Sequence, residues 1–353
     1  MRYCGILWLS SMGVASAATH SVEADGSGEF LSIQAALDAA GVGDVIEVGP
    51  GTYPESLELG AVSVALRSTA GAEDTILDAG SADVVLNFVE GTSPSMLVEG
   101  FTLLNSGGRG MTLKGASPTL VGLRMEGLGS SETNGGAVWI QGGSPSFEGC
   151  EFRGNFGLFG GAVYAEGTEL SLTDCSFDEN EANQGGAIYG EDVILWDVGG
   201  EYDFNIAEES GGAVRLNGPL EASFDSGRFW SNFTSENGGA VAAYGTTEAL
   251  EFKNVSFISN ESYWNGGAVS AEYGYNNVLF ESCHLDGNDG VYDYGAGIYA
   301  AYYTGVALVD TVIENHRAYY QGGGVYQYYG GDFRCEDSLI EDNFAATVGG
   351  GVR

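Results

Sequence analysis

Short segments in which apolar and polar residues alternate recur along the last two thirds of the chain, and a pair of glycines introduces each of them. Each copy reads Gly-Gly-Ala followed by a β-branched residue. These β-branched positions lie 25 to 28 residues apart: Val138, Val163, Ile188, Val214, Val241 and Val269. A period of this length is typical of repeat architectures, in which one unit buries its apolar face only against its neighbours.

A second motif precedes the glycines: a large apolar residue, two further residues and an asparagine. The asparagines are Asn155, Asn180, Asn205, Asn232, Asn260 and Asn288, and we assign the same element to Val312–Asn315 and Ile340–Asn343. The period-two alternation predicts β-strands. No repeat has a helical period, which excludes a solenoid of helix pairs. The chain is therefore predicted to be an all-β solenoid.

Stacking of the repeats explains both motifs. The glycines Gly160, Gly161, Gly185 and Gly186 would form a bend that needs positive φ and leaves no room for a Cβ below the next coil. At the other bend, the asparagines would adopt the left-handed conformation and hydrogen-bond through their amides to the next asparagine. We predict structural roles for these glycines and for Asn155, Asn180, Asn205, Asn232 and Asn260. The β-branched residues would form one inner column, at about 4.8 Å per coil.

The N-terminal part differs from the repeats. Residues 1–17 have the pattern of a secretory signal peptide, with an apolar stretch and a cleavage site of the A-x-A type. Residues 18–53 are predicted to form an N-terminal cap and a first strand, with Ser32 capping a helix over residues 33–40. Residues 54–353 would form the coils. No strand follows the last glycine motif, so we expect the coils to be incomplete at the C-terminus.

Two parts of the sequence resemble known families. Gly28-x-Phe30-x-Ser32-Ile33-Gln34, followed by Pro50-Gly51-Thr52-Tyr53, resembles the N-terminal cap of the pectin-lyase-like right-handed parallel β-helix superfamily. The Gly-Gly-Ala-aliphatic and Phe-x-x-Asn repeats resemble those of the polymorphic outer membrane proteins, which are surface-exposed and autotransported. The resemblance implies a right-handed parallel β-helix that is secreted or displayed at the cell surface or outer membrane.

The charge limits the partners. The chain carries 49 acidic and 12 basic residues, a formal net charge of −37, and would repel nucleic acid and anionic lipid. Past the signal segment no apolar run is long enough to span a membrane. The four remaining cysteines (Cys150, Cys175, Cys283 and Cys335) do not have the pattern of a disulfide scaffold. An extracellular glycan or a surface protein is the expected partner.

The resemblance also leaves open a polysaccharide-active enzyme, a lyase or a hydrolase. The sequence contains no Asp-Phe-Ile-Phe-Gly-like, Asn-Thr-Asp or Gly-His-Gly segment of the related pectin-degrading enzymes, and its basic residues are dispersed. His316, with Asp310 or Glu314, is one candidate base, although a surface role explains it equally simply. We therefore assign no catalytic residue, and no cofactor is required.

Two sets of residues are candidates for ligand binding. Tyr299, Tyr326 and Tyr328 belong to a tyrosine-rich C-terminal third and could bind a glycan or protein, or only stabilise neighbouring coils. Glu166 and Glu191 on adjacent coils, and Asp286 and Asn288 in a loop-like segment, are candidate calcium ligands, although a simple bend explains the latter pair. We predict an adhesin-like or structural protein without catalytic activity; a polysaccharide-active enzyme and a glycan-binding module are the alternatives.

Overall fold

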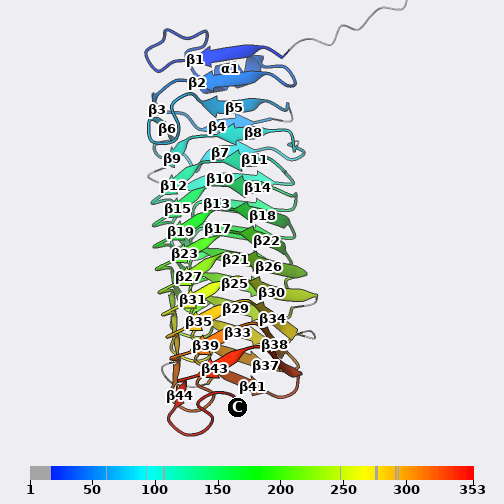
Figure 1. The fold of residues 1–353 in the computed structure, drawn as a ribbon. Helices are drawn as coiled ribbons and strands as arrows, with labels where there is room; N and C mark the ends of the chain where they lie inside the picture. Colours follow the sequence, from blue (N-terminus) through cyan, green and yellow to red (C-terminus); the bar gives the residue numbers. More distant parts are fainter. Residues whose placement is uncertain are drawn as a thin grey trace, which may run out of the picture.

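A computed structural model of the chain describes residues 17–353 except Ala61, Ser93, Ser106, Gly107, Thr247, Tyr275, Asn276, Val291 and Asp293. These residues form a right-handed parallel β-helix, as predicted. Its coils stack into a rod, with the cap at one end and the last coil at the other (Figure 1). Every strand ladder is parallel and joins strands of successive coils, for example Val163 with Ile188. The predicted signal segment lies almost entirely outside the described residues.

The strands form four sheets along the rod. Sheet A contains 13 strands: β1 (Thr19–Val22), β2 (Val45–Val48), β5 (Ala65–Ser68), β8 (Leu97–Glu99), β11 (Thr119–Val121), β14 (Ser146–Glu148), β18 (Glu169–Thr173), β22 (Ile194–Val198), β26 (Glu221–Asp225), β30 (Ala249–Lys253), β34 (Asn277–Glu281), β38 (Gly305–Val309) and β42 (Phe333–Glu336). Sheet B contains 12: β3 (Gly51–Tyr53), β6 (Thr75–Asp78), β9 (Thr102–Leu104), β12 (Arg124–Glu126), β15 (Glu151–Arg153), β19 (Ser176–Asp178), β23 (Glu201–Asp203), β27 (Arg228–Trp230), β31 (Ser256–Ile258), β35 (His284–Asp286), β39 (Val312–Glu314) and β43 (Leu339–Glu341).

Sheet C follows the glycine bends and contains 11 strands: β4 (Leu57–Leu59), β7 (Val84–Phe88), β10 (Arg109–Lys114), β13 (Val138–Gln141), β17 (Val163–Glu166), β21 (Ile188–Glu191), β25 (Val214–Asn217), β29 (Val241–Tyr244), β33 (Val269–Glu272), β37 (Ile298–Ala301) and β41 (Val325–Tyr328). Sheet D precedes those bends and contains eight: β16 (Phe156–Phe159), β20 (Glu181–Gln184), β24 (Ile206–Ser210), β28 (Phe233–Thr234), β32 (Glu261–Ser262), β36 (Asp289–Gly290), β40 (Arg317–Ala318) and β44 (Phe344–Ala345). The sequence analysis did not predict sheet D.

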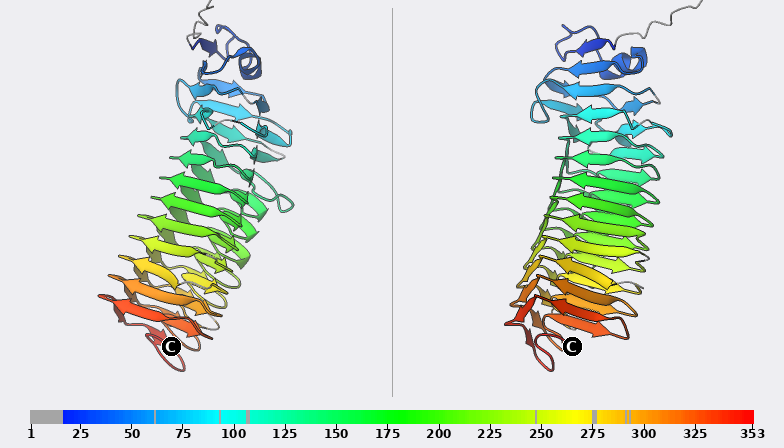
Figure 2. Two further views of the ribbon diagram at one scale, coloured as in Figure 1. Left: turned by 90° about the vertical axis from the view of Figure 1, so that its right-hand side faces the viewer. Right: turned by 45° about the vertical axis from the view of Figure 1, so that its right-hand side comes forward.

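The strands of successive coils lie above one another along the rod (Figure 2), and their buried side chains form the core. The predicted inner column is confirmed: Val138, Val163, Ile188, Val214, Val241 and Val269 are paired in register from coil to coil and are fully buried. A second column in sheet B stacks the rings of Phe152, Phe177, Tyr202, Phe229 and Phe257, with centroids 4.6 to 5.0 Å apart. The stacking repeats at the spacing of the strands, so each coil buries the apolar side chains of its neighbours.

The N-terminal cap closes one end of this core. Helix α1 (Ile33–Ala39) begins after Ser32, whose hydroxyl accepts a hydrogen bond from the backbone N–H of Ala35 at 3.2 Å, as predicted. The carboxylate of Glu55 accepts from two further N–H groups of the first turn. Ile33 is buried against the core. The strand β1 beside it was not predicted, and no helix of the described residues is long and apolar enough to cross a membrane.

The asparagines form a continuous buried ladder. In each step the side-chain oxygen of one asparagine accepts from both the backbone N–H and the side-chain amide of the asparagine one coil before; Asn180, for example, donates to Asn205 at 3.1 and 3.0 Å. The predicted amide bonding is therefore confirmed. The predicted left-handed conformation is wrong for the asparagines themselves: the preceding residue adopts it, as Glu179 and Phe204 do with φ of 56° and 55°.

The ladder changes at His316. Strand β39 pairs Ile313 with Leu285, so His316, and not Asn315, occupies the ladder position, and the predicted element is one residue out of register. The predicted surface position of His316 is also wrong, because its side chain is fully buried. Its Nδ1 accepts the backbone N–H of Asn288 at 2.8 Å, and its own N–H donates to Asn343.

Candidate functional site

The outer face of sheet C is not an open surface. Its second position holds an outward column: Trp139, Tyr164, Tyr189, Arg215, Ala242, Ser270, Tyr299 and Tyr326. Residues at and just beyond the ends of the sheet D strands fold over this column; the ring of Phe159 lies 5.1 Å from that of Tyr189. Most of the column is consequently buried although it points away from the core.

The aromatic column is interrupted in the middle of the rod. Between the stacked pair Tyr164 and Tyr189 and the stacked pair Tyr299 and Tyr326, the column contains an arginine and two small residues. A hollow of about 340 Å³, which we call the Arg215 hollow, lies beside this interruption. It is lined by Gln184, Glu209, Ser210, Arg215, Glu236, Asn237, Tyr244, Glu272, Tyr273 and Tyr302.

The guanidinium of Arg215 is the central group of this hollow. It lies over the ring of Tyr244, with 5.6 Å from its Cζ to the ring centroid. Its Nε is buried and has no hydrogen-bond partner among the described residues, and none of their acidic groups forms an ion pair with it. Burial lowers the pKa of Arg215 from its ordinary value, since removing the guanidinium from water disfavours the charge. A buried donor group without a partner is unfavourable for the folded state.

Glu272 faces the same hollow from strand β33. Burial raises the pKa of its carboxyl group, while the nearby charge of Arg215 acts in the opposite direction. Its hydrogen bond from the hydroxyl of Ser270 is long, at 3.5 Å. The arrangement places a cation, a partly desolvated carboxylate and aromatic rings around one hollow, which is typical of a ligand site.

The predicted binding tyrosines lie along the same face. The rings of Tyr299 and Tyr326 are parallel and 5.8 Å apart, and Tyr299 is almost fully buried. Tyr328 is exposed and lies 6.4 Å from Tyr326. The corner cluster of Tyr244, Tyr273 and Tyr302 lines the hollow, and none of these three tyrosines was among the predicted binding residues.

The candidate calcium ligands separate into two groups. Glu166 and Glu191 are adjacent and in register on sheet C, where Glu191 accepts from the hydroxyl of Tyr164 at 3.3 Å. Asp286 and Asn288 are not brought together: Asp286 points outward and accepts from Asn315, whereas the amide of Asn288 is buried in the ladder. The described residues contain no group of three acidic, histidine or cysteine side chains that could hold a metal ion.

The candidate base His316 does not reach a surface. Burial lowers its pKa to about 4. Its Nδ1 already accepts a backbone N–H group, and its buried Nε2 has no partner among the described residues. Among the described cysteines none is bonded to another, and Cys150, Cys175 and Cys283 are buried.

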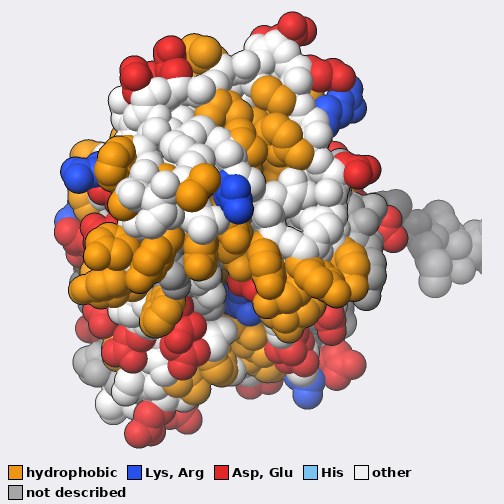
Figure 3. Space-filling view, turned by 90° about the horizontal axis from the view of Figure 1, so that it is seen from below, with side chains coloured by type: hydrophobic (Ala, Val, Ile, Leu, Met, Phe, Trp, Pro, Cys, Tyr) orange, Lys and Arg blue, Asp and Glu red, His pale blue; other side chains and the backbone are white. Residues whose placement is uncertain are grey.

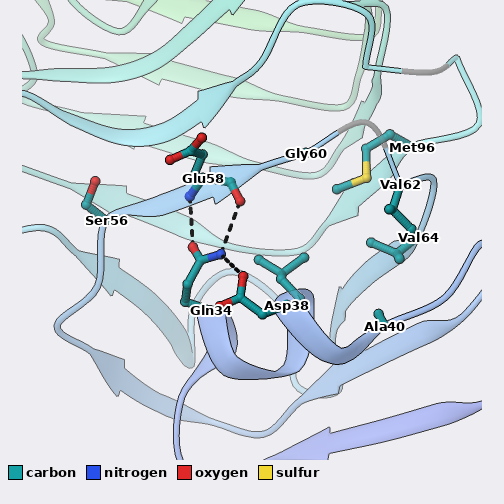
Figure 4. Close-up of a pocket in the computed structure, with 10 residues that line it drawn as sticks. Gln34, Asp38, Ala40, Ser56, Glu58, Gly60, Val62, Val64 and Met96 are labelled. Carbon is teal, nitrogen blue, oxygen red and sulfur yellow. Dashed lines mark hydrogen bonds between the residues drawn. The ribbon is translucent and has the colours of Figure 1, made fainter.

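A second hollow lies between the cap helix and strand β4 (Figure 4). The side chain of Gln34 spans it, since its amide donates to Asp38 at 2.9 Å and to the carbonyl of Glu58, while its oxygen accepts from the N–H of Glu58. These bonds join the helix to the first strand of sheet C. The polar groups of this hollow are therefore used in attaching the cap.

Comparisons with known proteins agree with the repeat interpretation over a short stretch. The sequence model of the Chlamydia polymorphic membrane protein repeat matches residues 174–191. No curated protein sequence matches the chain. Similar solved structures include a pectin methylesterase from carrot, with 10% identity, a TM-score of 0.36 and coverage of 88% of this chain and 82% of that one.

Two further solved structures show comparable likeness. The A-module of mannuronan C-5 epimerase AlgE4 from Azotobacter vinelandii has 10% identity and a TM-score of 0.37, and the match covers 93% of this chain and 100% of that module. The catalytic unit of a GH87 α-1,3-glucanase from Streptomyces thermodiastaticus has 13% identity and a TM-score of 0.44, covering 95% of this chain and 70% of that one.

Proposed function

We propose that this chain is a secreted or cell-surface β-helix that acts as an adhesin-like binding protein and holds an extracellular glycan along the outer face of sheet C. The observation that carries the proposal is the state of Arg215. Arg215 is half-buried at the Arg215 hollow, and its guanidinium makes no hydrogen bond or ion pair with the described residues. Its Nε is closed to solvent, so the two terminal nitrogens are the donors that a ligand with oxygen acceptors would meet.

The surroundings of the hollow support a glycan. Sugars are bound by aromatic rings together with a few polar side chains, and Tyr244, Tyr273 and Tyr302 lie beside Arg215 and Glu272. The match to a polymorphic membrane protein repeat supports a location at the cell surface or outside the cell. The dispersed negative charge supports a protein that works in the extracellular medium rather than on nucleic acid.

The test is a binding screen with two matched variants. Ser270 is the small residue between Ala242 and Tyr299 in the outward column, and Trp139 shows that this column accepts a tryptophan. Ser270 lies on the same strand as Glu272, which lines the hollow, so the bulky side chain of Ser270→Trp should displace that lining. Ser223→Trp places the same residue on the outer face of sheet A, beside Trp196. We expect the wild type and Ser223→Trp to bind the same members of a glycan array, and Ser270→Trp to lose them.

The screen also has outcomes against the proposal. If both variants bind every ligand as the wild type does, the hollow is not the binding site. If the wild type binds only proteins on a parallel array of extracellular proteins, the protein is an adhesin for a different kind of partner. Thermal melting of both variants checks that a loss of binding does not follow from unfolding.

A second candidate function is a polysaccharide-active enzyme, which Glu272 favours. A carboxyl group with a raised pKa beside an arginine is the type of group that acts as a general acid. The test is incubation with polysaccharides and detection of new reducing ends or unsaturated products. Activity that disappears in Glu272→Gln would favour the enzyme, and binding without any product would favour the adhesin-like protein.

A further inference from the structure

The Arg215 hollow also carries information about the class of glycan. Its lining contains one guanidinium and three carboxylates, Glu209, Glu236 and Glu272. The amide of Gln184 donates to Glu209 at 2.5 Å, so that carboxylate is held in place by an uncharged group. The hollow therefore has an excess of negative charge, in a chain whose formal net charge is −37.

This excess argues against an acidic polysaccharide. A uronate chain would bring one carboxylate for each sugar towards three carboxylates; Glu209 and Glu236 are exposed, whereas Glu272 is half-buried, where repulsion is screened less than at the surface. Arg215 could pair with only one of those groups. The field of the whole chain acts in the same direction and would lower the rate of encounter with a polyanion.

The hydrogen-bonding groups require a ligand that both donates and accepts. Arg215 offers donors and no acceptor, whereas Glu272 offers acceptors and no donor when it is ionised. A sugar hydroxyl can accept from a guanidinium and donate to a carboxylate at the same time. Neighbouring hydroxyls of one sugar would satisfy Arg215 and Glu272 together, without adding charge to the site.

The rings beside the hollow are consistent with this requirement. Tyr273 and Tyr302 are stacked with centroids 4.3 Å apart, and the ring of Tyr244 lies 4.7 Å from that of Tyr273 at an angle of 44°, so the middle ring presents mainly its edge and hydroxyl. Such a stack offers further hydrogen-bonding groups at the rim and little open aromatic face. Recognition would then depend mainly on hydroxyl groups.

We infer that the Arg215 hollow binds an uncharged glycan, with sugar hydroxyls bridging Arg215 and Glu272, and that it discriminates against polyuronates. This inference rests on the proposed binding function and specifies its ligand. It does not depend on the location of the protein in the cell.

The experiment measures binding of the full chain to hexasaccharides of glucose, mannose, N-acetylglucosamine and galacturonate by calorimetry. We expect at least one uncharged hexasaccharide to bind, with a Kd that changes less than about threefold between 20 and 500 mM NaCl, because no ligand charge is screened. The galacturonate hexasaccharide should not bind even at 20 mM NaCl, where its repulsion is strongest.

Variants locate the effect. Arg215→Gln and Glu272→Gln should each weaken binding of the uncharged hexasaccharide at least tenfold, while the exposed Glu201→Gln on sheet B serves as the matched control and should leave it unchanged. Glu272→Gln keeps the shape of the side chain, so it tests the acceptor role without opening a larger hollow. Melting curves of the variants should stay close to that of the wild type.

The outcomes separate this inference from the proposed function. Tighter binding of galacturonate than of every uncharged probe, lost in Ser270→Trp, would overturn the ligand class and leave the binding function intact. The absence of binding to all uncharged probes would also overturn the ligand class. An uncharged probe that binds equally to the wild type, Arg215→Gln and Ser270→Trp would show that the hollow is not the site, and both proposals would fail.

Discussion

Asp197 gives the sharpest prediction about stability, because it is an acid inside the core. It occupies the inner column of sheet A between Leu172 and Phe224, and its side chain is 2% exposed. Its Oδ2 accepts from the hydroxyl of Tyr202 at 2.9 Å, and its buried Oδ1 has no partner in the described part of the chain. Burial raises its pKa to about 7.

The direction and size of the pH effect follow from that pKa. The unfolded chain loses the Asp197 proton near pH 3.8, whereas the folded chain keeps it until about pH 7. Between these values the folded state binds more protons, so stability falls as pH rises and then levels off above pH 7. For a difference of about three pKa units, the ionisation of Asp197 lowers the free energy of unfolding by about 4 kcal/mol at pH 8 and by about 1.5 kcal/mol at pH 5.

The double variant Asp197→Leu/Tyr202→Phe removes the acid and its hydroxyl partner together and leaves no unpaired group. The phenylalanine ring introduced by Tyr202→Phe should keep the stacking, since Tyr202 lies between Phe177 and Phe229. We expect its gain in free energy of unfolding over the wild type to be larger at pH 8 than at pH 5, by about 2–3 kcal/mol. Packing changes act equally at both values and cancel in this difference.

The assay is urea denaturation of both proteins at pH 5 and pH 8, followed by circular dichroism. Tyr202→Phe alone is the control, because it removes the hydroxyl and leaves the acid. The reasoning would be refuted if the double variant changed stability by the same amount at both pH values. That result would mean that water reaches Asp197 or that its charge finds a partner.

Three further predictions concern the ladder and the charged face. Asn205→Ala should lower the free energy of unfolding by about 1–3 kcal/mol in denaturation experiments, because buried donors of the preceding coil lose their acceptor. The pKa of His316 is lowered to about 4 in the folded state, so the unfolded state takes up a proton first as the pH falls. Stability should therefore fall by about 3 kcal/mol from pH 6.5 towards pH 4. His316→Asn should remove this fall in acid denaturation experiments. Glu166 and Glu191 lie in register and repel each other, so the melting temperature should rise when NaCl is added at low ionic strength. Calcium should raise the melting temperature further only if the two carboxylates share an ion. Identical melting curves in calcium and in NaCl of matched ionic strength would exclude that calcium site.

The sequence predicted the inner columns because apolar alternation and a fixed period act together. It did not predict sheet D, because strands such as β28 and β32 have only two residues and show no alternation. The signal was present in another form: the second residue after each ladder asparagine is small, as Ala182 and Ala207 are, and faces inward in register. Small inward residues allow sheet D to lie close to the core.

The Arg215 hollow could not be predicted from local sequence. Arg215 and Glu272 are separated by two coils, and each occupies an outward position that a period-two pattern assigns to solvent. Their burial depends on the residues that follow the sheet D strands, for which no structure was predicted from the sequence. Only knowledge of the fourth sheet shows that outward positions of sheet C are covered.

The repeat explains why such a site can exist on this fold. The inner columns and the asparagine ladder fix the coils and vary little, with His316 and Asp197 as exceptions. The outward column of sheet C is not needed for stacking, and it changes from tyrosine to arginine, alanine and serine without altering the register of the strands. A tyrosine at each of these positions would continue the packed column. The interruption leaves a half-buried guanidinium whose terminal donors have no hydrogen-bond partner among the described residues, and a ligand with oxygen acceptors would pair with them.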